Sequence, residues 1–174
     1  PAGLTLEKWT SSMRSDASRT SNQVDGTPRL LMLHSLAHVV IKRLAFDAGY
    51  AASSIRERIY SGPVGSEICG LLVYTADGDS QGSLGGLVRM GEPHRLGKVI
   101  QSALADAAWC SADPVCREGK MHDATKKSMA SCHACMLASE TTCNHNNTLL
   151  DRRLLVGISE VPPFFDLDAM FLDE

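Results

Sequence analysis

Apolar residues recur at helical spacing between positions 29 and 48 and predict a long helix there. Pro28 stands where the first turn of a helix tolerates proline, and Gly49 is of the residue type that commonly follows a helix end. The apolar positions surround much of the helix, so we expect it to lie at the centre of the core. They are Leu30, Leu33, Leu36, Ala37, Val40, Ile41 and Leu44.

Shorter patterns follow this helix and predict both strands and helices. Residues 55–60 alternate apolar with charged side chains, which favours a half-exposed strand, while Ser53 and Ser54 leave a short helical turn as the alternative. Residues 69–75 are apolar and predict a buried strand in which Cys69 is a packed, inert thiol. Helices are expected at 93–109 and about 141–150, and a last strand at 154–158. These elements predict an α+β fold, a small sheet packed with helices.

The chain has 174 residues, of which 44% are hydrophobic, so one domain with a core is the expected organisation. We expect a flexible N-terminal segment or linker at 1–27, because much of it is polar and lacks apolar periodicity, and a single domain at 28–159. Residues 160–174 alternate acids with large apolar side chains, which predicts either a solvated tail or a segment that docks on a partner. The absence of an initial Met indicates processing or a piece of a longer polypeptide.

The net charge of −3 argues against an autonomous nucleic-acid binder, because such proteins usually carry a basic excess. Any DNA contact is therefore expected to be local or shared with a partner. Apolar runs are too short to cross a bilayer, and no signal-peptide pattern is present. Together with the cysteine content, these features predict a cytoplasmic protein without membrane contact.

Five cysteines between residues 110 and 143 predict a subdomain at about 110–147 that is stapled by zinc on four cysteine ligands. Two of them are spaced Cys132-His133-Ala134-Cys135, which allows two thiolates to meet one tetrahedral ion from a single tight turn. A redox dithiol would lack further cysteines close by, and disulfides would need an oxidising compartment. Structural zinc is therefore the preferred interpretation.

Five cysteines compete for four zinc positions. Cys132 and Cys135 are the firmest candidates, Cys143 follows at a spacing typical of zinc loops, and either Cys116 or Cys110 completes the set. We favour Cys116, which lies in a predicted turn, over Cys110, which ends an apolar helix and suits a core position. The neighbouring histidines are expected to be surface residues or outer hydrogen-bond donors to the site: His122, His133 and His145.

Two further features carry weaker indications of chemistry. His34 and His38 share the histidine spacing of zinc proteases, but Ser35 stands where those enzymes need glutamate, so buried, hydrogen-bonded histidines are expected instead. The loop from Asp77 to Gly86 is rich in Gly, Ser and Asp, which leaves open a phosphate contact, a structural turn, or the active centre of a metal-dependent, nuclease-like hydrolase. The candidate phosphate contacts in this loop are Ser80 and Gly82, and Asp79 would test the hydrolase alternative.

Six segments together carry a more specific pattern. They are Leu33-His34-Ser35-Leu36-Ala37-His38, Ser54-Ile55-Arg56-Glu57-Arg58-Ile59-Tyr60, residues 75–87 (Thr75 to Leu87), residues 109–116 (Trp109 to Cys116), Cys132-His133-Ala134-Cys135 and Leu149-Leu150-Asp151-Arg152. Jointly, over about residues 28–158, they resemble the zinc-binding C-terminal (MZB) domain of Mrf-type helicases. More narrowly, the pattern is similar to that domain in the DrmB family of the DISARM bacterial antiphage system.

This resemblance implies a non-catalytic accessory of DNA-translocating machinery. It implies zinc at Cys116, Cys132, Cys135 and Cys143, and a separate helicase subunit of the DrmA type as partner. The chain has no helicase motor motif of its own, so ATP hydrolysis is not expected in it. A pure protein-interaction module is a further alternative. Basic residues that we expect to contact DNA phosphates are Lys120, Lys126, Lys127, Arg152 and Arg153.

Overall fold

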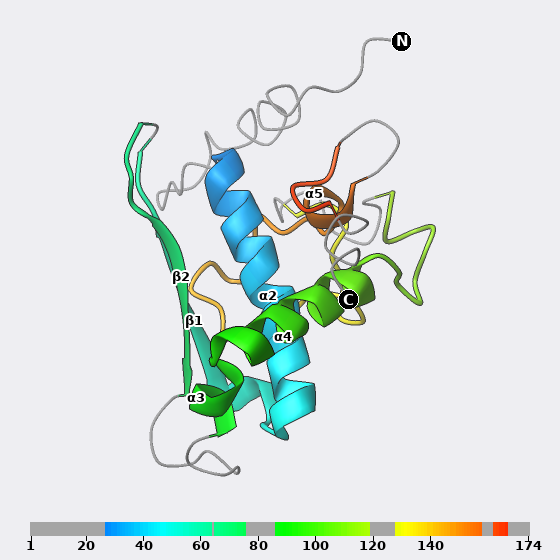
Figure 1. Cartoon of the computed structure of the whole chain (residues 1–174). Helices are drawn as coiled ribbons and strands as arrows, with labels where there is room; N and C mark the ends of the chain where they lie inside the picture. The colour runs from blue at the N-terminus through cyan, green and yellow to red at the C-terminus, as the bar shows by residue number, and fades with distance from the viewer. Residues whose placement is uncertain (1–26, 64, 76–85, 119–127, 158–161, 167–174) are drawn as a thin grey trace.

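The computed structural model describes residues 27–63, 65–75, 86–118, 128–157 and 162–166. Its elements are α2 (Pro28–Ala48), η2 (Ala52–Ser54), β1 (Ile55–Ser61), β2 (Cys69–Thr75), α3 (Gly86–Met90), α4 (Pro93–Ala107) and α5 (Arg153–Val156). Figure 1 shows α2 running between a two-stranded hairpin and α4, which crosses it. This arrangement confirms the α+β class.

Helix α2 is the central element, as its apolar pattern predicts. The Thr27 hydroxyl caps its start by accepting a hydrogen bond from the backbone N–H of Leu30 at 3.2 Å. Gly49 follows its last turn with a φ of 71°, a left-handed conformation that glycine adopts without steric cost. The helix buries residues on several sides, including the two polar side chains of His34 and His38. These histidines therefore lie in the interior.

The hairpin places one face of β1 against α2. Strand β1 pairs antiparallel with β2, from Ile55 opposite Thr75 to Ser61 opposite Cys69. Ile55 and Glu57, two residues apart, are completely buried because alternate residues of a strand share a face. The helical turn and the strand that were expected here as alternatives both form, since a 3-10 turn at Ala52–Ser54 leads directly into the strand.

Strand β2 is present where it was predicted, but the burial of Cys69 was predicted wrongly. The Cys69 side chain is exposed. It lies at the turn end of the hairpin, and β2 is an edge strand in the described two-stranded sheet. An apolar run therefore does not establish burial on both faces when the sheet has only two strands.

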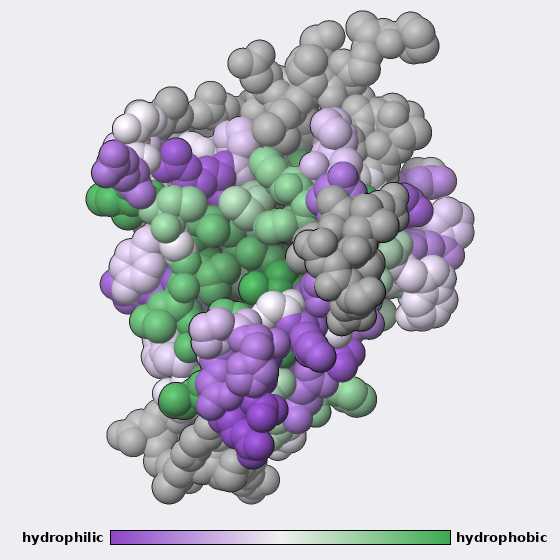
Figure 2. Space-filling model, viewed as in Figure 1, coloured by the Kyte–Doolittle hydropathy of each residue, from purple (hydrophilic) through white to green (hydrophobic). Residues whose placement is uncertain are grey.

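Helix α4 packs across α2 and completes the main core. It begins at Pro93 and ends at Ala107, two residues before the predicted end, which leaves Trp109 70% exposed. An apolar groove of about 300 Å³ opens where β2, α2, α3 and α4 meet, and Figure 2 shows hydrophobic residues gathered over this face. The buried core includes Val40, Ile41, Leu44, Ile55, Val99, Ala103, Leu104, Met136, Leu150 and Leu155.

The segment after α4 is held mainly by turns, and two predictions for it were wrong. No helix forms among the described residues 141–150, where Asn146, Asn147 and Leu149 have left-handed φ values of 51°, 56° and 58° that a right-handed helix cannot contain. The described part of the apolar run predicted as a strand at 154–158, residues 154–157, does not form one, because Arg153–Val156 make the short helix α5. Leu154 and Leu155 are buried from this helix.

In the part of the chain that the structure describes, no helix combines the length and the apolar character needed to cross a membrane. The N-terminal segment before residue 27 and most of the acidic tail lie outside the described residues. The predicted domain limits of 28 and 159 therefore stay predictions.

Candidate metal centre

Four cysteines from two turn-rich segments meet beside the end of α4. Cys110 lies just beyond α4, which ends at Ala107, and Cys116 follows in the next turns, where its backbone N–H donates to the carbonyl of Ala112 at 2.9 Å. The other two come from a tight turn around Cys132 and Cys135. The Cys132 carbonyl accepts hydrogen bonds from the backbone N–H groups of Cys135, Met136 and Leu137 at 3.2, 2.9 and 3.0 Å. Each pair is thus positioned by local backbone bonds.

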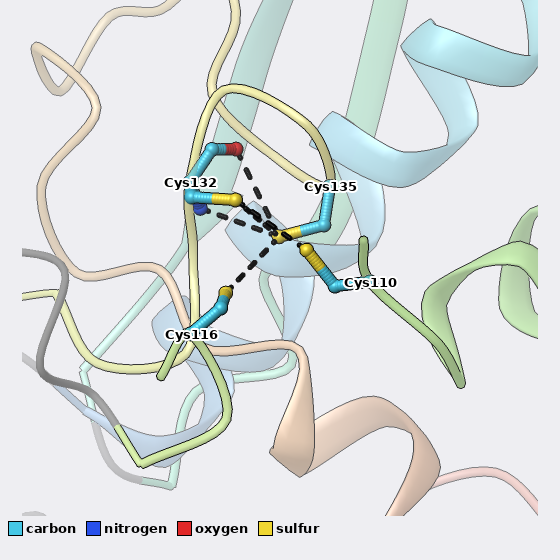
Figure 3. Close-up of side chains that lie close together, drawn as sticks. All are labelled: Cys110, Cys116, Cys132 and Cys135. Atoms are coloured by element: carbon cyan, nitrogen blue, oxygen red, sulfur yellow. Dashed lines mark hydrogen bonds between the residues drawn. The ribbon is translucent and has the colours of Figure 1, made fainter. Parts of the chain in front are cut away.

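The four sulfur atoms point toward one another (Figure 3). Cys110 Sγ lies 3.5 Å from Cys132 Sγ, Cys116 Sγ lies 3.6 Å from Cys135 Sγ, and Cys132 Sγ lies 3.7 Å from Cys135 Sγ. All four ligand atoms lie within 4.8 Å of one another. A tetrahedral zinc ion with Zn–S bonds of about 2.3 Å would separate its sulfur ligands by about 3.8 Å. The observed spacing therefore fits a zinc site with four cysteine ligands.

Backbone N–H groups point at two of these sulfurs. The N–H of Ala112 donates to Cys110 Sγ at 3.4 Å, and the N–H of Cys132 donates to Cys135 Sγ at 3.2 Å. Such donors favour the thiolate form, which is the form that binds metal. Cys110, Cys116 and Cys132 are buried, and Cys135 is partly buried.

In the absence of an ion, the thiols of the cluster differ in their pKa. Burial, together with the neighbouring thiols Cys132 and Cys110, raises the pKa of Cys116 to about 11. Burial also tends to raise the pKa of Cys132, but hydrogen bonds from the backbone of Cys135 and from the adjacent thiols outweigh it and lower that pKa to about 7. Several thiolates cannot share this space without a cation, so a divalent ion is the natural counter-charge for the cluster.

A buried ion pair ties the Cys110 segment to the chain near α5. The Arg152 guanidinium is buried and pairs with the Asp113 carboxylate, while Arg152 Nη1 donates to the Ala107 carbonyl at 3.0 Å. Asp113 also accepts from the backbone N–H groups of Cys110 and Arg117, both at 3.1 Å. The carboxylate therefore orders the turn that carries Cys110 and Cys116.

The predicted ligand set differs from the set that the fold brings together. Cys116, Cys132 and Cys135 meet, but Cys110 joins them and Cys143 does not. The end of α4, which suggested a core role for Cys110, is what delivers this thiol to the cluster. His133 is exposed, His145 is partly buried near His34, and His122 lies outside the described residues.

Most of the residues predicted to contact phosphate fall outside the part of the chain that the structure describes. Ser80, Gly82, Lys120, Lys126 and Lys127 lie outside the described residues. Arg152 is 1% exposed and points into the interior, a position that does not suit a DNA contact. Arg153 is partly buried, and its guanidinium Nη2 lies 2.6 Å from the Asp151 carboxylate.

Cys143 lies instead in a second buried cluster with His34, His38 and Glu57. The glutamate that the α2 histidines lack in their own helix is supplied by β1. Sequence reasoning missed Glu57, because charged residues on both sides of it, Arg56 and Arg58, gave an exposed-looking pattern. The one indication in the sequence that Glu57 is buried is its position two residues from Ile55, which places both on the same face of a strand.

The fold and the four-cysteine centre, which could hold one ion between turn-rich segments, define a zinc-binding domain. Residues 36–136 match the family described as the MrfA Zn-binding domain, and this range contains all four clustered cysteines. The chain belongs to this family. Its cofactor is accordingly zinc.

One curated relative is similar to this chain over most of the chain's length. Over 137 residues the chain is 42% identical to the DISARM protein DrmB of Bacillus paralicheniformis. The match covers 78% of this chain and 24% of that protein, so the chain corresponds to about a quarter of its relative's length.

Proposed function

We propose that this chain is a non-catalytic, zinc-stabilised accessory domain of a helicase-associated antiphage defence complex. In this proposal Cys110, Cys116, Cys132 and Cys135 bind the zinc. The ion fixes their turns in place, and the domain then offers a folded surface to a helicase subunit and to DNA.

The observation that carries the proposal is the four-sulfur cluster within a matched zinc-binding domain. The sulfur separations of 3.5 to 3.7 Å suit a closed site with four protein ligands, which is the arrangement of structural zinc. A catalytic zinc keeps one position open for water or substrate. The 42% identity to a DISARM protein supports a place in such a defence system.

A non-catalytic role is also supported by the placement of the α2 histidines. His34 and His38 are both 0% exposed, so they are not open to a substrate from solvent. The rival active centre, the loop from Asp77 to Gly86, remains a hypothesis drawn from the sequence. Its test is the loss of a metal-dependent nuclease activity on Asp79→Ala.

The partner is proposed to be a DrmA-type helicase subunit in the cytoplasm, and the DNA contact is proposed to include Lys126 and Lys127. Each phosphate contact made by such a residue adds about one counterion to the salt dependence of binding. Exchange of both lysines for alanine is therefore expected to weaken DNA binding and to flatten its salt dependence. Fluorescence anisotropy with labelled duplex and single-stranded DNA at several salt concentrations measures both effects.

The partner contact is tested by co-elution of the tagged chain with a purified DrmA-type helicase subunit. Wild type and the Cys69→Ser variant are expected to co-elute with the helicase, because Cys69 is exposed and lies outside the cysteine cluster. Cys132→Ser is expected to lose the zinc of the four-cysteine centre and the partner. Failure of the wild-type chain to bind the helicase, with its zinc in place, would contradict the proposed partner and leave the zinc site intact.

A further inference from the structure

The second buried cluster joins four potential metal ligands from three parts of the chain. His34 and His38 lie one turn apart on α2, Glu57 comes from β1, and Cys143 comes from the turns that precede α5. Exposure is 0% for the first three residues and 5% for Cys143. One ligand atom from each residue lies within 4.8 Å of the others, as in the four-cysteine centre.

The distances between the donor atoms match the edges of a small coordination polyhedron. His34 Nε2 lies 3.1 Å from Glu57 Oε1 and 3.2 Å from Cys143 Sγ, and His38 Nε2 lies 3.5 Å from Glu57 Oε1. Zinc bonds of about 2.0 to 2.3 Å to nitrogen, oxygen and sulfur place tetrahedral ligands about 3.3 to 3.6 Å apart. The cluster is therefore close to the size that one such ion requires.

Hydrogen bonding among the described residues does not satisfy these groups. Both carboxylate oxygens of Glu57 and the Nε2 atom of His38 are buried without a hydrogen-bond partner there, since their close approaches lack hydrogen-bond geometry. A buried carboxylate without hydrogen bonds is costly, and buried polar groups in native proteins are nearly always hydrogen-bonded or bound to an ion. The Glu57 and histidine atoms converge on one point, and a cation at that point would satisfy them together.

The surroundings hold two of the donors, His38 and Cys143, in the orientation that a metal needs. His38 Nδ1 lies 2.9 Å from the Met136 carbonyl, so Nδ1 donates to this oxygen and the lone pair of Nε2 faces the cluster. Metal-bound histidines commonly make this outer hydrogen bond. Cys143 Sγ accepts from the backbone N–H groups of His145 and Asn147 at 3.3 and 3.2 Å. The bond from His145 comes from the N–H group two residues after the cysteine. The bond from Ala112 to Cys110 Sγ in the four-cysteine centre has the same spacing.

The charge and type of the donors select the ion. A carboxylate and a thiolate with two neutral imidazoles carry two negative charges, which one divalent cation balances without solvent. Calcium and magnesium prefer oxygen ligands, whereas a mixed nitrogen, sulfur and oxygen set suits zinc. Four protein donors in a buried position leave no room for a substrate and describe a structural site.

We propose that His34, His38, Glu57 and Cys143 form a second zinc site, separate from the four-cysteine centre. This site joins α2, β1 and the segment before α5, three parts of the chain that are distant in sequence. The proposal of this site does not depend on the proposed helicase partner or on the proposed DNA contact.

The first test is zinc stoichiometry and X-ray absorption at the zinc edge on the whole 174-residue chain, purified without chelator. Two ions per chain are expected, with nitrogen or oxygen ligands besides sulfur in the averaged coordination. One ion with an all-sulfur environment would overturn the second site and leave the four-cysteine centre standing. One ion in a mixed environment would keep the second site and remove the first.

A variant pair assigns the second ion to its ligands. Glu57→Gln keeps the side-chain shape, removes the negative charge and is expected to lower zinc content from two ions to one, with an all-sulfur spectrum remaining. Glu67→Gln, an exposed change of the same type, is expected to retain both ions. Retention of two ions and of the mixed spectrum in Glu57→Gln would overturn the assignment. If that variant does not fold, the wild-type spectrum still decides the proposal.

Discussion

The two buried clusters differ in how the chain assembles them. The four-cysteine centre draws its ligands from two short segments, 110–116 and 132–135, that contain turns and no strand. The second cluster takes three of its four residues from α2 and β1, elements with their own hydrogen bonds and apolar contacts. The four-cysteine centre therefore relies on its ligands to order the surrounding turns, whereas the second cluster has its ligands positioned by helix and strand.

This difference determines what each cluster needs in order to persist. Turns with few apolar contacts have little free energy of their own to offset the entropy of ordering, so we expect the ordered state of 110–116 to depend on the ion. Helix α2 packs Leu44 and Ile41 into the main core, so apolar contacts stabilise it in addition to any metal. We therefore expect the two regions to respond differently when zinc is removed.

The largest expected effect is that of Cys132→Ser. Structural zinc in small domains contributes an apparent binding free energy of about 10 to 16 kcal/mol, which is comparable to the whole stability of a domain. The exchange is expected to abolish zinc binding at the four-cysteine centre and amide protection in 110–118 and 128–137. Hydrogen exchange read by mass spectrometry measures this loss by segment.

The matched control for this exchange is Cys69→Ser, which changes an exposed thiol outside both clusters. It is expected to keep the wild-type protection pattern. If α2 lost protection as completely as 128–137 in Cys132→Ser, the two regions would form one cooperative unit and the contrast between them would fail.

The next effect in size is expected for Asp113→Asn. The change leaves the Arg152 guanidinium, 1% exposed, without its negative partner, and breaking a buried ion pair in this way costs about 3 to 5 kcal/mol. Urea denaturation of the zinc-loaded chain measures the cost. Asp106→Asn is the control, because its pairing with Arg43 is exposed and such pairs contribute about 0 to 1 kcal/mol. Equal costs for both variants would show that Asp113 does not support the cysteine turns.

The sequence allowed the prediction of two features that depend on neighbouring residues. The helical spacing from Leu30 to Leu44 located α2, and the spacing of Cys132 and Cys135 indicated the zinc turn. Both are properties of a few consecutive turns of chain. The zinc cofactor was predictable for the same reason, although the full set of its ligands was not.

Whatever depends on tertiary contacts was not predictable. Cys143 was assigned to the nearer cysteines, yet the chain around it turns through left-handed Asn146 and Asn147 and places its thiol against α2. Glu57 meets His34 only because β1 packs on α2, and no spacing in the sequence encodes that encounter. The choice between Cys110 and Cys143 likewise required the path of the chain after α4.

The smallest effect that we expect concerns the bridge between the two regions. Lys42, on α2, donates from Nζ to the carbonyls of His133 and Ala134 at 3.0 and 2.8 Å, so a stable helix holds the zinc turn from outside. These bonds are solvent-exposed, and Lys42→Met is expected to cost about 1 kcal/mol, which corresponds to about a fivefold faster release of zinc to a chelator. The control Lys98→Met, on the exposed face of α4, is expected to release zinc at the wild-type rate. If Lys42→Met released zinc as slowly as the control, the cysteine turns would hold their ion without help from these two bonds to α2.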